Sequence, residues 1–346
     1  MPGSVRTTRA PVKITDVAAA AGVAPMTVSR VINTPDRVSA ATALRVRAAI
    51  EQLGYVPNLV AGGLSSRRSR MVAAIVPTIA HPMFSEMVQT FTDAMRQAGY
   101  QVMLSLAGYA EGIEDDLIRG LLGRRPDAML VTGADHTPPM RQMLAEAGIP
   151  VVEVFDVTPQ PIDMLVGLDH AAAGAAVAAF FRARGFERFA MFAAGDARAR
   201  QRQRGFVEAV RQEGGRVLAE PVLPAPSTIA AGRQALRDLL PHLVERTALF
   251  CSSDLLAFGA ITEARLHGIA VPDRLAVCGF GNFELSAMSE PAFTTVNVEG
   301  AQIGRTAAEF LLGRLLGGTR VESRFHVPFR IVERASSWGV APHSRC

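Results

Sequence analysis

The chain has 346 residues, which is enough for two or three compact units, and 49% of them are hydrophobic. No apolar run approaches the roughly 20 residues needed to cross a bilayer, and no apolar segment follows the first basic residues, so we expect neither a membrane protein nor a secreted one. Residues 1–70 hold ten Lys or Arg against three Asp or Glu, whereas residues 71–346 hold 26 against 29, a contrast typical of a nucleic-acid-binding head on a soluble sensor.

The cysteines give no sign of a metal site. Cys251, Cys278 and Cys346 lack metal-ligand spacing and are odd in number. Cys251 and Cys278 fall in apolar, strand-like runs, so we expect them to be core residues. We therefore expect no metal and no cofactor, and a protein of the reducing cytoplasm.

Residues 1–11 are short, polar and proline-containing, and we interpret them as a disordered arm. Residues 14–33 then predict two short helices that meet at a turn. Thr15 can cap the first helix, and Gly22 can end it because glycine adopts the left-handed conformation without a Cβ clash. Pro25 fits the first turn of the second helix, where its missing N–H costs no hydrogen bond. The pattern favours a helix-turn-helix, whose second helix would enter the major groove, over an ordinary helical hairpin.

The second helix is predicted to be amphipathic. Its apolar face consists of Val28, Val31 and Ile32. The side chains that then point outward are those of Met26, Thr27, Ser29 and Arg30. A third helix is predicted to follow, with Ser39 as its N-cap and Gly54 at its end.

From residue 71 onward, short apolar runs alternate with helical patterns. The expected strands cover residues 72–77, 101–106, 128–132 and 151–155, followed by a second series that starts at residue 165 and includes 189–192, 249–251 and 275–278. Such alternation predicts parallel sheets covered by helices on both faces, and two series in tandem predict two doubly wound lobes. In this class, ligands bind beyond the carboxyl ends of the strands, here in a cleft between the lobes.

In this order, the segments resemble the LacI/GalR family of bacterial transcription regulators over residues 12–332. The matching segments are residues 14–33, 38–39, 53–58, 75–77, 166–169, 202–206, 253–254, 278–280 and 294–296. Residues 108–109, 132–138, 148–153 and 166–169 are also similar to the gluconate-operon repressors of that family.

The resemblance implies a domain organisation. It places an all-α helix-turn-helix bundle at residues 12–57, a hinge helix with linker at 58–70, and an α/β periplasmic-binding-protein-like domain of two doubly wound lobes at 71–346. Lobe one would contain residues 71–168 and 298–324, and lobe two residues 169–297 and 325–340, with a last strand at 325–332. The resemblance also implies a homodimer on a pseudo-palindromic operator in double-stranded DNA.

By position in the family pattern, one set of residues is expected to contact DNA. These residues are Thr15, Pro25, Met26, Thr27, Ser29, Arg30, Asn33, Tyr55, Asn58, Ala61 and Leu64. Arg30 is the candidate for a bidentate contact to guanine O6 and N7, with a phosphate contact as the alternative. Leu64 would enter the minor groove from a hinge helix that Gly62 and Gly63 destabilise away from DNA; a plain flexible linker is the alternative.

A second set is expected to contact a small-molecule effector in the cleft. These residues are His81, Phe84, His136, Thr137, Asp169, Arg202, Ser253, Asp254, Phe280 and Glu284. Arg202 matches the family's ligand-clamping arginine, whose fork of donors suits vicinal hydroxyls or a carboxylate. Asp169 and Asp254 have the rival role of capping the helices that follow them. A solvated helix face is expected for three other arginines, Arg198, Arg200 and Arg204.

The chain departs from the family pattern at Gly281, where many sugar-binding members have an aspartate after the aromatic residue. Loss of that carboxylate favours an acidic ligand, because like charges repel strongly in a low-dielectric site. We therefore expect gluconate or a close sugar acid, which would release DNA and make the protein a repressor. The alternatives are 2-ketogluconate, a phosphorylated sugar acid (disfavoured by Glu284), a neutral sugar and a purine.

Two other classes of protein fit the sequence poorly. It contains no nucleophile elbow, P-loop, HExxH, or GxGxxG after the first strand, so we do not expect an enzyme. A transport-type sugar-binding protein built on the same lobes would need a signal sequence and no basic helix-turn-helix.

Overall fold

The computed structural model describes residues 12–56, 69–110, 112–317 and 322–337. The chain divides into two units, Met1–Ser69 and Arg70–Cys346. The expected N-terminal arm and the expected hinge contacts of Asn58, Ala61 and Leu64 lie outside the described residues.

Between residues 12 and 56, the first unit forms three α-helices around a small apolar core. They are α1 (Ile14–Ala21), α2 (Pro25–Asn33) and α3 (Ala40–Leu53), with a 3-10 turn at Pro35–Arg37. One fully buried valine from each helix forms the centre of the core: Val17, Val28 and Val46. Gly22 ends α1 with a φ of 63°, in the left-handed conformation that the sequence predicts for it.

The predicted cap of α1 is wrong. The helix begins at Ile14, so Thr15 lies within its first turn. Lys13 is the N-cap residue, and its backbone N–H donates to the Asp16 carboxylate at 2.8 Å. This bond to the third helical residue satisfies an otherwise unpaired donor, and the helix starts two residues earlier than it would with Thr15 as its cap.

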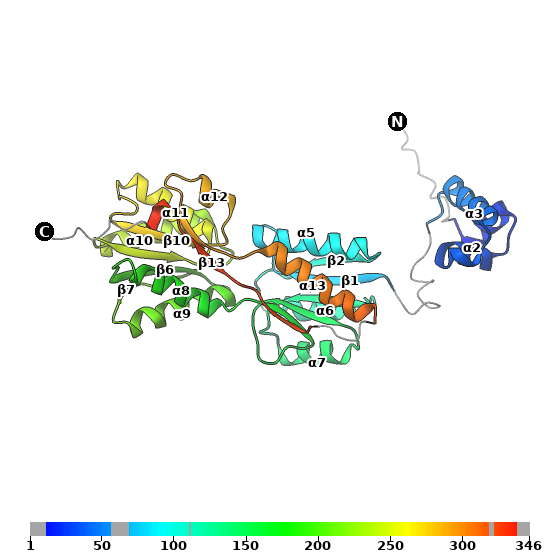
Figure 1. Cartoon of the computed structure of the whole chain (residues 1–346), viewed down its shortest axis with the longest axis horizontal. Helices are drawn as coiled ribbons and strands as arrows, with labels where there is room; N and C mark the ends of the chain where they lie inside the picture. Colours follow the sequence, from blue (N-terminus) through cyan, green and yellow to red (C-terminus); the bar gives the residue numbers. More distant parts are fainter. Residues whose placement is uncertain (1–11, 57–68, 111, 318–321, 338–346) are drawn as a thin grey trace, which may run out of the picture. The chain divides into compact units, whose positions relative to one another are not determined.

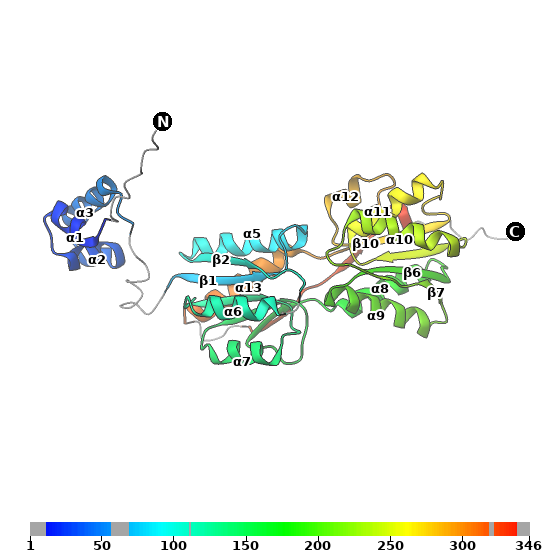
Figure 2. The same ribbon diagram turned by 180° about the vertical axis from the view of Figure 1, so that it is seen from behind.

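In the second unit, the first sheet is entirely parallel and has the order β12-β5-β4-β3-β1-β2. Its strands are β1 (Met71–Val76), β2 (Gln101–Leu106), β3 (Ala128–Thr132), β4 (Val151–Phe155), β5 (Met164–Gly167) and β12 (Arg324–His326). Helices α5 (Pro82–Gln97) and α13 (Gly300–Leu315) cover one face, and α6 (Ile113–Leu122) and α7 (Pro138–Glu146) cover the other (Figures 1 and 2). Successive residues of β1 alternate between the two resulting cores, with Ala74 on the α5 side and Ile75 on the α6 side, as a strand buried on both faces requires.

The second sheet has the order β13-β11-β10-β9-β6-β7, and the short strand β8 also pairs with β6. Its strands are β6 (Arg188–Ala194), β7 (Arg216–Ala219), β8 (Val222–Leu223), β9 (Thr247–Cys251), β10 (Leu275–Phe280), β11 (Thr294–Asn297) and β13 (Arg330–Val332). Helices α8 (His170–Arg182) and α9 (Ala197–Gln212) cover one face, and α10 (Ile229–Leu239) and α11 (Asp254–Leu266) cover the other (Figure 1). Short helices at Glu284–Met288 (α12), Leu240–His242 and Ala335–Ser337 complete this lobe. Cys251 and Cys278 are buried and form no disulfide, so their prediction as core residues is confirmed.

The single last strand expected over residues 325–332 is wrong. The chain forms two strands there: β12 runs parallel to β5 in the first sheet, and β13 runs antiparallel to β11 in the second. Pro328 lies between them and has no N–H for a sheet hydrogen bond, so one ladder cannot continue through it. The third passage between lobes therefore lies at residues 327–329, a few residues later than expected. None of the helices in the described part of the chain is long and apolar enough to cross a membrane.

Candidate DNA-reading helix and ligand cleft

Helix α2 presents one side to solvent, because Val28 and Val31 are turned into the core of the bundle. Met26 is 63% exposed, Pro25 and Arg30 are also exposed, and Thr27 and Ser29 are partly exposed. The other members of the expected DNA-binding set that the structure describes are Thr15, exposed on α1, Asn33, the last residue of α2, and Tyr55, which packs against the bundle core. The face around Met26 and Arg30 is thus available to a groove of DNA.

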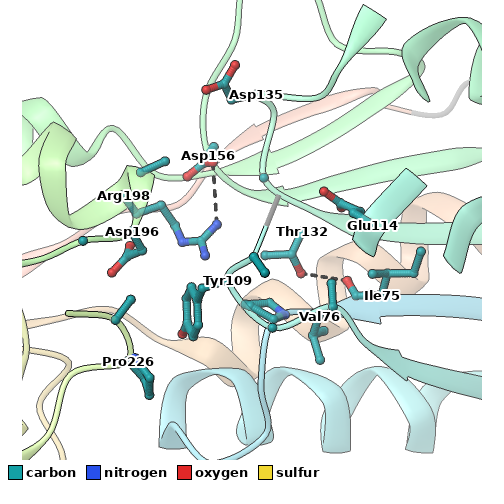
Figure 3. A pocket seen from close by; sticks show the side chains of 18 of the residues that line it. Ile75, Val76, Tyr109, Glu114, Thr132, Asp135, Asp156, Asp196, Arg198 and Pro226 are labelled. Atoms are coloured by element: carbon teal, nitrogen blue, oxygen red, sulfur yellow. Dashed lines mark hydrogen bonds and ion pairs between the residues drawn. The ribbon is translucent and has the colours of Figure 1, made fainter. Parts of the chain in front are cut away.

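In the second unit, two adjoining cavities lie between the lobes, at the carboxyl ends of the strands. The outer cavity has a volume of about 880 Å³, and the inner cavity has a volume of about 30 Å³. Tyr109, Asp196 and Arg198 line both. Figure 3 shows the outer cavity, with Asp196 and Arg198 of lobe two facing Glu114 and Thr132 of lobe one.

Arg202 lines the inner cavity because two helices approach each other closely. A Cβ atom on Gly205 of α9 would lie 2.1 Å from the Ala171 carbonyl oxygen, and one on Gly174 of α8 would lie 2.1 Å from the Arg202 carbonyl oxygen. Only glycine permits this approach of two backbones. The glycine of the Arg-Gln-Arg-Gly motif thereby brings Arg202 beside His170, the first residue of α8.

The guanidinium of Arg202 is buried and held on three sides. Nη1 donates to His170 Nδ1 at 2.8 Å, Nη2 donates to the Ser252 carbonyl oxygen at 3.0 Å, and the Phe280 ring centroid lies 4.1 Å away. Burial lowers the pKa of Arg202 to about 10, which leaves it positively charged at neutral pH. Its Nε is buried and has no hydrogen-bond partner among the described residues, so this N–H is a donor that a ligand could use.

The arginine also fixes the tautomer of His170. Arginine only donates hydrogen bonds, so His170 Nδ1 must accept, and the ring proton lies on Nε2, 3.4 Å from Asp156 Oδ1. Burial lowers the pKa of His170 to about 4, so the ring is neutral. Burial alone would raise the pKa of Asp156, but His170 and Arg198 (3.8 Å away) hold it below its ordinary value. Asp156 of lobe one therefore contacts two basic groups of lobe two.

His81, the N-cap residue of α5, lies at the inner cavity as expected of a residue after the first strand. Its ring packs edge-on against Phe84 and Phe283, with centroids 5.8 and 4.7 Å away. Burial first, and then the charge of Arg202, lower its pKa to about 4. Its Nδ1 is a second buried atom without a hydrogen-bond partner in the described structure. Phe84, Ser253 and Phe280 line the same cavity.

His136 does not face the cleft, contrary to expectation. Its side chain is buried, with Nε2 lying 3.4 Å from Glu153 and Nδ1 lying 4.0 Å from Glu114. Glu153 is a fully buried carboxylate within β4 and requires a positive or hydrogen-bonding neighbour, which explains this orientation. Its neighbour Thr137 does line the outer cavity, where it also caps α7.

Three expected carboxylates lie outside both cavities. Asp169 caps α8 by accepting from the Ala172 N–H at 2.8 Å, which is the rival role considered for it. Asp254 is buried and accepts hydrogen bonds from the backbone of Phe283 and from Thr295, while Ser253 caps α11; burial raises the pKa of Asp254 to about 7. Glu284 is exposed at the start of α12, because the adjacent Phe283 occupies the inward position.

Several cavity residues were not in the expected set. They are Tyr109, Glu114, Asp135, Asp156, Asp196 and Arg198. Arg198, expected on a solvated face, instead has a largely buried side chain beside Asp156. Asp156 directly follows β4 and Asp196 closely follows β6, so the rule that ligands bind at carboxyl ends of strands could have identified both. No cluster that could hold a metal ion occurs among the residues that the structure describes.

Comparison with known proteins agrees with this arrangement. Residues 13–58 match the family model described as bacterial regulatory proteins, lacI family, and residues 178–337 match the periplasmic binding protein-like domain. The HTH-type transcriptional regulator GntR of Pseudomonas aeruginosa is 34% identical over 336 residues, which cover 96% of this chain and 98% of that protein.

Two solved structures are similar over nearly the whole chain. A LacI family transcriptional regulator from Silicibacter pomeroyi superposes with a TM-score of 0.89 at 32% identity, covering 94% of this chain and 99% of that one. The lac repressor dimer bound to operator and an anti-inducer superposes with a TM-score of 0.83 at 25% identity, with the same coverage.

Proposed function

Because the chain belongs to the LacI family of bacterial transcription regulators, we propose that it is a repressor that binds a pseudo-palindromic operator as a homodimer and is released by a sugar acid, with gluconate the first candidate. The observation that carries the ligand class is the buried, positively charged Arg202, whose Nε faces no acceptor in the described structure. A ligand carboxylate would satisfy that donor and neutralise the charge.

Helix α2 is the proposed reading element for DNA. Arg30 is exposed beside Met26, and its planar fork can donate two parallel hydrogen bonds to the O6 and N7 atoms of guanine. Met26 would add an apolar contact, for instance to a thymine methyl group. The similarity to a lac repressor dimer on its operator supports two copies on one site.

The contacts between lobes suggest how a ligand would affect DNA binding. Asp156 of lobe one lies beside Arg198 and His170 of lobe two, and both partners adjoin Arg202. A bound acid would compete for these basic groups and favour one arrangement of the lobes over another. If that arrangement binds DNA less well, the affinity for DNA would fall, at most by the ratio of the ligand's affinities for the two arrangements.

The choice of gluconate rests on two features. The first-lobe stretches at residues 108–109 and 132–138 are similar to gluconate-operon repressors, and Gly281 brings no carboxylate to the cleft. Because the characterised relatives are named as regulators, we propose a binding function for the cleft rather than catalysis.

Calorimetric titration of the full chain tests the ligand class. We expect heat of binding with gluconate or 2-ketogluconate, and none with ribose or hypoxanthine. Arg202→Gln should abolish that heat because it removes the buried charge. Heat of binding with ribose or hypoxanthine alone would contradict the assignment of a sugar acid as the effector. Unchanged gluconate affinity in the Arg202→Gln variant would show that Arg202 does not bind the effector.

A further inference from the structure

The two cavities differ in charge. The inner cavity is lined by two arginines, Arg198 and Arg202, and one carboxylate, Asp196. Among the described residues, the outer cavity is lined by five carboxylates, those of Glu114, Asp115, Asp135, Asp156 and Asp196, and by two arginines, Arg198 and Arg200. In Figure 3, Glu114, Asp135, Asp156 and Asp196 surround the outer cavity on different sides. The cleft is therefore positive at its inner end and negative along its outer wall.

Three of the outer carboxylates already have partners. Asp115 accepts from the Thr137 hydroxyl at 2.9 Å, Asp156 lies beside Arg198 and His170, and Asp196 caps α9 by accepting from the Ala199 N–H. The carboxylates of Glu114 and Asp135 make no hydrogen bond among the described residues. Glu114 has an ion-pair contact with His136 Nδ1 at 4.0 Å, and Asp135 makes no ion pair with any residue that the structure describes.

The cavities also differ in size. A volume of about 30 Å³ is roughly that of one water molecule in the liquid, so the inner cavity has room for a small terminal group and not for a sugar ring. Arg202 and His81 line this small space, and Arg202 Nε and His81 Nδ1 have no hydrogen-bond partner among the described residues. A carboxylate at the end of an open chain fits the volume and can accept a hydrogen bond from the Arg202 Nε–H.

We propose that the effector lies lengthwise in the cleft, with its single carboxylate in the inner cavity and its hydroxylated chain in the outer cavity, where Glu114 and Asp135 accept hydroxyl groups and exclude a second negative charge. This inference rests on the proposed sugar-acid effector and adds the residues that select a monocarboxylate over a dicarboxylate. Burial raises the pKa of Glu114, which indicates that this carboxylate is poorly solvated and that water screens its repulsion of a second anion only weakly, whereas Asp135 is exposed.

Gluconate and glucarate form the matched pair of ligands for a test, because they share a six-carbon chain and differ by a carboxylate in place of the terminal alcohol. In calorimetric titration of the full chain at neutral pH and fixed ionic strength, glucarate should bind at least about tenfold more weakly than gluconate. Sorbitol, which lacks a carboxylate, should not bind.

The double variant Glu114→Gln, Asp135→Asn keeps an acceptor oxygen at each position and removes both charges. It should bind glucarate more tightly than the wild type does, so that the preference for gluconate falls to about threefold or less. Asp116→Asn is the matched control, since it removes one charge from an exposed position on the same helix, α6, outside both cavities. It should leave the preference unchanged.

The outcomes separate this inference from the proposed function. Equal binding of gluconate and glucarate by the wild type would overturn the lengthwise orientation and leave the sugar-acid effector standing. An unchanged preference in the double variant would overturn the role of Glu114 and Asp135. Absence of binding of both gluconate and 2-ketogluconate by the wild type would overturn both proposals.

Discussion

The guanidinium of Arg202 brings a positive charge into a part of the cleft with almost no solvent. His170 and the Ser252 carbonyl oxygen each take one of its terminal N–H donors, and the face of Phe280 covers the group. Two buried nitrogen atoms without a hydrogen-bond partner in the described structure, the donor Arg202 Nε and His81 Nδ1, belong to residues that line the inner cavity. A buried donor without a partner costs free energy, so the site is prepared for an acceptor that a ligand supplies.

His81 predicts a dependence of stability on pH. Its pKa falls from 6.5 to about 4 on folding, so between these values the unfolded chain binds a proton that the folded chain does not. The free energy of unfolding should therefore fall as the pH decreases from about 6.5 to 4. His81→Asn should reduce the loss between pH 7 and pH 5 by about 1–2 kcal/mol, given about 1.4 kcal/mol per pKa unit.

Urea denaturation of the wild type and of the His81→Asn variant at both pH values measures this difference. Contributions from His170 and Asp254 are present in both proteins and cancel in the comparison. An identical loss of stability in the two proteins would mean that His81 can be protonated in the folded state at pH 5.

For some single residues, the position in the site could not be predicted from the sequence. Arg202 could be predicted from its motif, whereas its partner His170 could not, because their contact depends on how closely α8 approaches α9. Glu284 was predicted to contact the effector, but it is exposed, and the adjacent Phe283 is the buried residue. His136 was predicted to lie in the cleft, but its side chain turns towards the buried Glu153 carboxylate. The sequence alone does not show that Glu153 is buried without enough polar neighbours, because this depends on how the strands and helices pack.

At the scale of elements, the strands buried on both faces could be predicted because their sequences are continuous apolar runs. The predicted range for β3, residues 128–132, agrees with the structure, and every residue of this strand is buried. Strands β7 and β8 are short and partly exposed, and carry no comparable signal. The division of the last strand by Pro328 also required the pairing partners to be known.

The crossing of α8 and α9 predicts the effect of a single methyl group. In Gly205→Ala, the new Cβ would lie 2.1 Å from the Ala171 carbonyl oxygen, and a backbone atom cannot rotate away as a side chain can. We expect a loss of about 1–3 kcal/mol in the free energy of unfolding, measured by urea denaturation.

Gly120→Ala serves as the control for this substitution. Gly120 lies within helix α6 and has no atom within 4 Å of the position of a Cβ. That change should leave stability unaltered or raise it by up to about 1 kcal/mol, since alanine is the better helix former. If Gly205→Ala were equally neutral, the close crossing would not be needed to place Arg202.

At the scale of the whole molecule, a basic N-terminal unit, with α2 as its proposed reading helix, is joined to a two-lobed unit with a charged cleft. The family, and the assignment of DNA binding to the first unit and ligand binding to the second, could be predicted because many short segments occur in a fixed order. The ligand class rests instead on a few side chains, so it requires an independent measurement. The full regulator must couple the two activities: DNA binding and ligand binding.

Fluorescence anisotropy of the full chain on an operator selected from random DNA tests that coupling most directly. We expect the complex to dissociate as gluconate is added, with a midpoint near the gluconate Kd from calorimetry. Arg30→Ala, as a control for reading by α2, should weaken binding to the operator by about 1–3 kcal/mol and binding to random DNA by less. An operator complex that remains intact at saturating gluconate would contradict the account.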